Sequence, residues 1–116
     1  MGPTEKLEVN GKVKATEFLY SSDKNLKDDI KILSNSLDKI SRLNGVSFSW
    51  RDNDQQSIGL IAQDVEKIFP ELVTTDSATS LKSLNYAGLI APLIEAVKAQ
   101  QQEIESLKER LRLLEK

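Results

Sequence analysis

The feature that most constrains the fold is a repeat of apolar residues near the end of the chain. Across residues 90–116, the first positions of successive heptads are Ile90, Val97, Ile104 and Leu111, and the fourth positions are Leu93, Gln100, Leu107 and Leu114. A narrow apolar seam of this kind is typical of helices that supercoil around one another. An amphipathic helix packed on its own domain is the alternative, but the seam is surrounded by polar residues, which favours self-association. The sequence therefore predicts a long C-terminal helix in a coiled coil.

The flanking charges predict a parallel arrangement. In a parallel coil Glu103 would face Lys108 of a neighbour, and Arg110 would face Glu115. Both pairs attract, and such pairs set orientation more than stability. Gln100 is expected to cost stability and to fix the register.

The seam alone leaves the number of strands open. Ile and Val at the first heptad position with Leu at the fourth favour two strands. The order Arg, apolar, two variable residues, apolar, Glu over residues 110–115 is instead typical of short trimeric coiled coils.

The chain upstream of this helix mixes short patterns of both periods. Residues 1–20 have alternating apolar residues around Asn10-Gly11, which predicts a hairpin that ends something longer. Residues 21–29 are polar. Apolar residues then recur at helical spacing from Ile30 to Leu43, with Ser34 as a candidate N-cap and Asn44-Gly45 as a stop.

The remaining segments predict short strands and a small helix. Strands are expected over 46–50, 58–62 and 82–85, a helix over 63–69, and loops over 51–56 and 74–80. Asn85 is a candidate cap for the last helix, and Pro92 predicts a kink or break in it. The expected fold class is therefore α+β: a small mixed domain followed by the long helix.

The composition excludes several kinds of site. The chain has no cysteine and no histidine, which removes disulfides, Cys/His zinc sites, thiol nucleophiles and a Ser-His-Asp triad. The run Asp52-Asn53-Asp54 lacks the glycine and distal glutamate of a calcium loop. No metal or cofactor is expected. There is no basic stripe and no apolar run of membrane-spanning length, so neither nucleic acid nor a membrane is an expected partner.

Without histidine, a serine nucleophile needs another base, and a lysine whose pKa is lowered by burial or by nearby positive charge can serve. Ser22 and Lys27 lie five residues apart in the polar loop, where a bend would bring their side chains together. Serine and lysine occur together in most polar loops, so this spacing alone is weak evidence.

A series of ordered motifs gives the pair a context. Ser22-Asp23 is followed by Leu26-Lys27 and Ile30, and the later blocks are Leu43-Asn44-Gly45-Val46 with Phe48 and Trp50, Ile58-Gly59-Leu60-Ile61-Ala62-Gln63-Asp64-Val65, Phe69-Pro70-Glu71-Leu72-Val73, and Tyr86, Leu89 and residues 92–96. In this order they resemble the intramolecular chaperone and auto-processing domain at the C-terminus of phage endosialidases, tail fibres and neck appendages. Similar domains occur in myelin-regulatory-factor transcription factors.

The resemblance implies a role for each matched residue. Ser22 would be the nucleophile of a Ser-Lys dyad and Lys27 its general base, with the cleavage site at Ser21, Ser22 and Asp23. Asp23, beside the scissile bond, would help to orient the site. Many phage relatives carry a histidine just before the Gly-apolar-apolar-Ala-Gln block, where this chain has Ser57-Ile58. If that histidine assists cleavage in those relatives, processing here would be slower or differently tuned.

The resemblance also implies an architecture and a life cycle. Residues 1–21 would end the upstream β-stalk of a fibre, residues 22–89 would be the chaperone and auto-processing domain, and residues 90–116 would form a parallel trimeric coiled coil. The partners would be two further copies and the upstream fibre segment. The precursor of a virion tail fibre would be made in the host cytoplasm and would release its chaperone by autoproteolysis. The alternatives are a non-catalytic trimerisation cap, the auto-processing domain of a membrane-tethered transcription factor, and a cytoplasmic adaptor with a helical tail.

Overall fold

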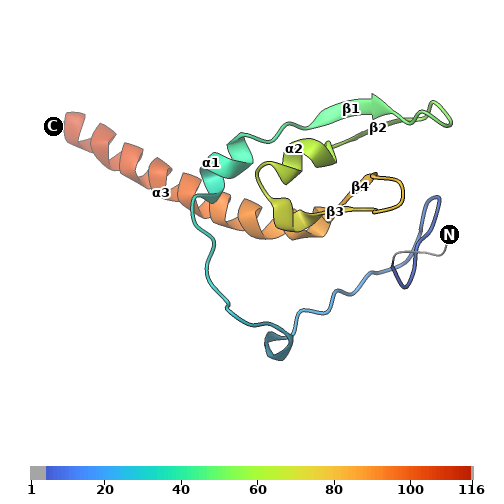
Figure 1. Ribbon diagram of the computed structural model, residues 1–116. Coiled ribbons are helices and arrows are strands. Elements are labelled where there is room, and N and C mark those ends of the chain that lie inside the picture. Colours follow the sequence, from blue (N-terminus) through green and yellow to red (C-terminus); the bar gives the residue numbers. More distant parts are fainter. Residues whose placement is uncertain (1–4, 116) are drawn as a thin grey trace. The chain divides into compact units, whose positions relative to one another are not determined.

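A computed structural model describes residues 5–115. Residues 1–4 of the predicted stalk segment and Lys116 of the predicted coiled-coil helix therefore lie outside the described residues. The chain divides into two units, residues 1–32 and 33–116, and each is considered by itself (Figure 1).

The first unit is extended. Within its described residues, 5–32, the one regular element is a single 3₁₀ turn, η1 (Lys24–Leu26). The hairpin predicted around Asn10-Gly11 is wrong for the described residues 5–20, because no strand forms there and Asn10 does not adopt a positive φ. An isolated two-stranded hairpin is marginally stable at best, so the turn signal alone does not impose one.

The second unit is the predicted α+β domain with its long helix. Its regular elements, in order, are α1 (Ser36–Ser41), β1 (Val46–Ser49), β2 (Gln56–Gly59), α2 (Ala62–Glu66), η2 (Pro70–Leu72), β3 (Val73–Thr75), β4 (Lys82–Leu84), η3 (Tyr86–Leu89) and α3 (Ile90–Leu114). The strands form two separate antiparallel hairpins, with Val46 opposite Gly59 in the first and Val73 opposite Leu84 in the second.

The helix predicted from Ile30 to Leu43 is much shorter in the structure. It begins only at Ser36, and Asn35 precedes it in the left-handed region with a φ of 60°. Ser34 is therefore not its N-cap, and the helix ends at Ser41 rather than at Asn44. Ile40 and Leu43 are partly buried against the core, whereas Ile30 and Leu33 are exposed, so the predicted stripe packs on the domain only in its second half.

The core lies where α2, η3 and the two hairpins meet. Val65, Phe69 and Leu89 are buried at its centre, and seven partly buried apolar residues pack on them: Ile40, Leu43, Leu60, Ile68, Leu72, Val73 and Leu84. The Lys39 ammonium lies 5.8 Å from the centre of the Phe69 ring. Side chains from both ends of the domain thus converge on one small cluster.

Helix α3 is continuous through Pro92, so the predicted kink is wrong. Asn85 caps the preceding turn η3 by accepting a hydrogen bond from the Gly88 amide, and α3 then begins at Ile90. Pro92 is therefore in the first turn of α3, where a backbone N–H has no intrahelical partner to lose. In Figure 1, α1 lies beside the first half of α3, and the second half extends beyond it.

Candidate autoproteolytic site

The local fold of residues 22–27 is set by one capped turn. The Asp23 carboxylate accepts a hydrogen bond from the Asn25 amide at 2.8 Å. Two further backbone bonds close the turn, from the Leu26 amide to the Asp23 carbonyl at 3.0 Å and from the Lys27 amide to the Lys24 carbonyl at 3.1 Å. In a fully extended strand, residues five apart in sequence are separated by roughly 16 Å. The turn is therefore what brings residues 22 and 27 close together.

The turn brings the two predicted catalytic side chains into contact. The Lys27 ammonium donates a hydrogen bond to the Ser22 hydroxyl, with 2.7 Å between Nζ and Oγ. Both residues are exposed, as are Ser21 and Asp23 on either side of Ser22. The predicted dyad and cleavage residues are therefore together and accessible in the single chain.

The Ser22 hydroxyl could act as a nucleophile and the Lys27 amine as its base, provided that the amine is deprotonated. A lysine ammonium has three donors and no acceptor, so it must lose a proton before it can take one from a hydroxyl. Burial of a lysine favours that neutral form. Lys27 is exposed, so the turn by itself does not bury the amine.

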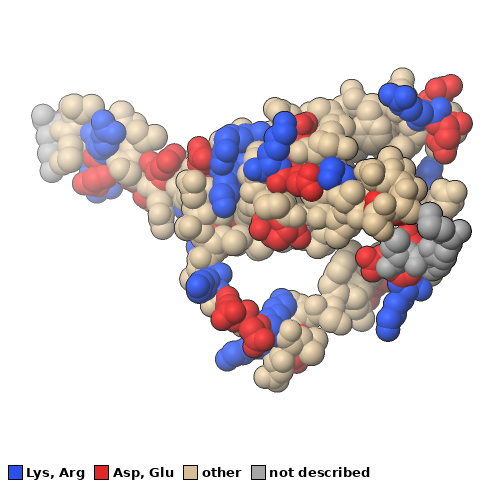
Figure 2. Space-filling view, in the orientation of Figure 1, with Lys and Arg blue, Asp and Glu red and all other residues tan. Residues whose placement is uncertain are grey.

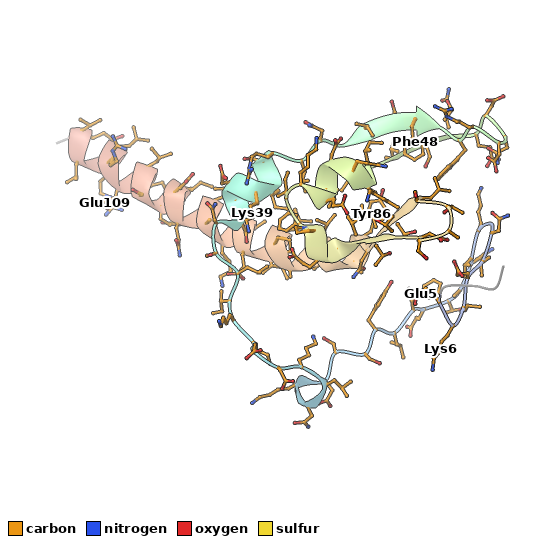
Figure 3. All side chains as sticks on the ribbon, in the orientation of Figure 1. Glu5, Lys6, Lys39, Phe48, Tyr86 and Glu109 are labelled. Carbon is orange, nitrogen blue, oxygen red and sulfur yellow. The ribbon has the colours of Figure 1, made fainter. Side chains whose placement is uncertain are left out.

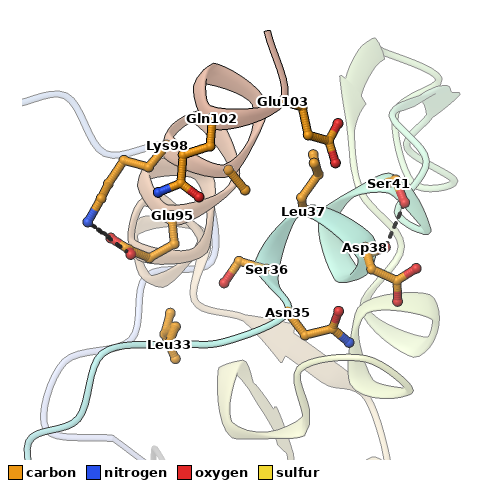
Figure 4. A pocket seen from close by; sticks show the side chains of 11 residues that line it. Leu33, Asn35, Ser36, Leu37, Asp38, Ser41, Glu95, Lys98, Gln102 and Glu103 are labelled. Atoms are coloured by element: carbon orange, nitrogen blue, oxygen red, sulfur yellow. Dashed lines mark hydrogen bonds and ion pairs between the residues drawn. The ribbon is translucent and has the colours of Figure 1, made fainter. Parts of the chain in front are cut away.

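Helix α3 carries two apolar stripes, and the domain uses only one of them. Pro92 and Ala96 are buried and Ala99 is half-buried, on the side where α1 packs. The groove between the two helices is lined by Glu95, Lys98, Ala99, Gln102 and Glu103 from α3, none of which is a seam position (Figure 4). The stripe of Pro92, Ala96 and Ala99, which packs on the domain, thus lies beside the heptad seam, and the domain leaves that seam uncovered.

The heptad seam itself is exposed along its length in the single chain. Exposed fractions are 59% for Ile90, 46% for Leu93, 61% for Val97, 45% for Ile104, 54% for Leu107, 60% for Leu111 and 81% for Leu114, and Gln100 is exposed as well. A row of exposed apolar side chains on one helix face indicates an interaction surface.

Two glycines and a tyrosine that the sequence did not single out as structural lock the domain to the start of α3. The Tyr86 hydroxyl accepts a hydrogen bond from the Leu60 amide at 2.9 Å and donates one to the Leu60 carbonyl at 3.3 Å. A side-chain carbon on Gly59 would lie 2.6 Å from the Tyr86 hydroxyl oxygen, and one on Gly88 would collide with Leu72. Figure 3 labels Tyr86, which makes this contact, and Phe48 of β1. Local sequence patterns do not reveal this contact, because its two partners are 26 residues apart in the chain.

The charged side chains do not gather by sign on the face that Figure 2 presents, where lysines and arginines lie among aspartates and glutamates. In the part of the chain that is described, no helix has both the length and the apolar character needed to cross a bilayer.

The sequence motifs resemble a class of domain that combines three features. This chain has each of them: a serine hydroxyl beside a lysine amine on a capped turn, a small α+β domain, and a long helix with an exposed apolar seam. Residues 22–74 match the profile of the family described as chaperone of endosialidase, whose label also places it among peptidase families. This match, together with the tail fibre relatives described next, supports a phage tail fibre chaperone domain in this chain.

The relatives are fibre proteins. The chain is similar to long tail fiber protein Gp37 of Salmonella phage S16, with 33% identity over 90% of this chain and 15% of that protein. It is 30% identical to Gp37 of Enterobacteria phage K3 over 85% of this chain and 9% of that protein, and equally similar to Gp37 of phage T2 over 8% of that protein. The chain thus spans only a small part of the length of these relatives.

Proposed function

We propose that this chain is an intramolecular chaperone that trimerises, templates the folding of an upstream tail fibre or tailspike segment, and then releases itself by autoproteolysis beside Ser22. The observation that carries the proposal is the 2.7 Å contact between the Ser22 hydroxyl and the Lys27 amine. Its partners are two further copies of the chain and the fibre segment upstream. The fibre part remains in the virion, and the chaperone part leaves after assembly in the host cytoplasm.

The proposed chemistry is acyl transfer to Ser22. Neutral Lys27 takes the hydroxyl proton as Oγ attacks the carbonyl carbon of Ser21. The bond from that carbon to the Ser22 nitrogen breaks, the released amine gains a proton, and an ester joins Ser21 to the Ser22 oxygen. Water then hydrolyses the ester and leaves a Ser21 carboxylate and a free Ser22 hydroxyl.

The same residues support cleavage on the other side of Ser22. A serine oxygen cannot usefully attack its own carbonyl, so cutting between Ser22 and Asp23 requires the Ser22 hydroxyl of a neighbouring copy. The proposal therefore covers a bond flanking Ser22, and the mass of the fragments distinguishes the two.

Trimerisation is the step that explains why a chaperone belongs at this position. A trimeric β-stalk has many contacts between residues far apart in sequence, and such folds form slowly and expose strand edges. A coiled coil that forms first holds three chain ends at high effective concentration and in register. Removing the template afterwards closes the reverse route, so the stability of the fibre becomes kinetic.

The test compares purified chains of matched variants by intact mass and by light scattering. Ser22→Ala and Lys27→Ala should each give uncut chain that is still a trimer. Lys24→Ala is the matched control, since it removes an exposed lysine of the same turn that makes no side-chain contact with Ser22. Cutting at this site in Ser22→Ala or Lys27→Ala would disprove the catalytic assignment.

A second function, a non-catalytic trimerisation cap, is supported by the exposure of Ser22 and Lys27 and by the fibre proteins among the relatives. It predicts that wild-type protein stays intact as a trimer under all conditions tested, including within an assembled fibre. A fragment whose end falls at Ser22 or Asp23 rules it out.

A further inference from the structure

The 3₁₀ turn that joins Ser22 to Lys27 has very little to hold it in place. It is a single turn of three residues, η1, and none of them is buried. An isolated turn is unfavourable because several backbone dihedrals are fixed for few hydrogen bonds. Local hydrogen bonds must therefore decide how often the turn is formed.

Among the described residues, the one side chain that bonds to the backbone of this turn is that of Asp23. Asp23 has the extended backbone of an N-cap, with φ of −64° and ψ of 137°, and its carboxylate accepts from the Asn25 amide at 2.8 Å. Aspartate at an N-cap satisfies an amide that would otherwise lack a partner. Among the described residues the Asp23 carboxylate makes no ion pair with Lys27, so its contact is with the backbone of the turn.

We propose that Asp23 is a positioning residue for the Ser22–Lys27 pair and acts by capping the turn, not by its charge. This inference rests on the proposed function, because it concerns the rate of the same cleavage. The capped turn carries Lys27 back toward Ser22. Without the cap the segment reverts more often to extended chain, in which the hydroxyl and the amine are too far apart to exchange a proton.

Four substitutions separate the cap from the charge. Asp23→Asn and Asp23→Ser remove the charge and keep a capping oxygen, whereas Asp23→Ala removes both. Asp23→Glu keeps the charge but places its carboxylate one methylene further out, and glutamate is not a preferred N-cap. Asp28→Ala is the matched control, because Asp28 is an exposed aspartate just beyond the turn.

The measurement is the fraction of uncut full-length chain against time after a short pulse of cell-free synthesis, with trimer content followed by light scattering. Loss of an N-cap lowers the population of the turn about fivefold. Asp23→Ala and Asp23→Glu should therefore cut about fivefold more slowly than wild type. Asp23→Asn, Asp23→Ser and Asp28→Ala should cut within about twofold of wild type, and all five variants should still trimerise.

The outcomes separate this inference from the function on which it rests. If Ser22→Ala is still cut, the proposed function itself is wrong. If Ser22→Ala is inert but Asp23→Asn is as slow as Asp23→Ala, the charge matters and the capping role is refuted. Wild-type speed in Asp23→Ala also refutes it. Rescue by Asp23→Asn and Asp23→Ser, with slow cutting in Asp23→Glu, supports it.

Discussion

Two leucines near the end of α3 provide a sharp test of the coiled coil. Leu111 lies on the heptad seam and Leu113 does not, yet in the single chain their exposed fractions are almost equal, 60% and 57%. In a monomer, Leu111→Ala and Leu113→Ala should therefore have the same small effect. In a parallel trimer, only Leu111 is covered by neighbouring chains.

The expected difference follows from the exposed fraction. Replacing leucine by alanine removes three carbons, and burial of each is worth about 0.8 kcal/mol. If the 60% of Leu111 that is exposed becomes buried in the trimer, the loss is about 1.4 kcal/mol per chain and about 4 kcal/mol for three chains. The trimer dissociation constant should therefore rise about 10³-fold for Leu111→Ala.

The assay is analytical ultracentrifugation over a dilution series, with both leucine variants made in the Ser22→Ala background so that the chains stay intact. For Leu113→Ala we expect a change of about tenfold at most, because exposed substitutions usually alter stability by no more than about 0.5 kcal/mol per chain. Equal shifts for the two variants would refute the assigned seam. With Ser22 restored, Leu111→Ala should also cut poorly at concentrations where it no longer assembles, and unchanged cutting there would separate catalysis from assembly.

Two further predictions concern the stability of the domain, measured by denaturant unfolding. Gly59→Ala should destabilise the domain by about 1–3 kcal/mol, because the new carbon would lie 2.6 Å from the Tyr86 hydroxyl oxygen, and moving that hydroxyl away leaves the Leu60 backbone groups without their partner. Unchanged stability would show that the hydroxyl contact is dispensable. Lys82→Met should cost about 1 kcal/mol, because Lys82 Nζ lies 3.1 Å from Glu66 and 2.8 Å from Thr75 at a partly buried position. A gain in stability would mean that burial of the charge outweighs these contacts.

The sequence predicted the parts of the fold that depend on spacing along the chain. The alternation from Val46 to Trp50 identified β1, and the helix predicted over 63–69, closed by Pro70, overlaps α2. Asn85 was correctly predicted as a cap. Each of these signals acts over a few residues, where side-chain direction and backbone geometry are directly linked.

The errors arise where distant contacts decide the outcome. The stripe from Ile30 to Leu43 has helical spacing, but the chain is helical only from Ser36, where α1 packs on α3. Pro92 was predicted to disturb the helix because the helix was expected to begin at Tyr86. In the structure η3 occupies residues 86–89, so α3 begins at Ile90 and Pro92 lies in its first turn. The second stripe of α3, at Pro92, Ala96 and Ala99, was missed because small residues give a weak apolar signal.

The candidate site was predicted in part. The five-residue spacing of Ser22 and Lys27, read with the family motifs, identified two side chains that the structure places in contact. The cap that joins them was not predicted, although Asp23 was already part of the predicted cleavage site. The resemblance implied that Asp23 helps to orient the site, but only the hydrogen bond from the Asn25 amide shows a contact by which it can do so.

The closure of the pair within residues 22–27 has a consequence for the order of events on the ribosome. All hydrogen bonds that join Ser22 to Lys27 lie inside these six residues, so a growing chain carries the pair before α3 has been translated. If the pair were active at that moment, the chain would be cut beside Ser22 before the chaperone part had been synthesised. Under the proposed function, the environment that the Lys27 amine needs forms only after α3 has been translated and three complete chains have associated. The late synthesis of α3 therefore delays cleavage until assembly.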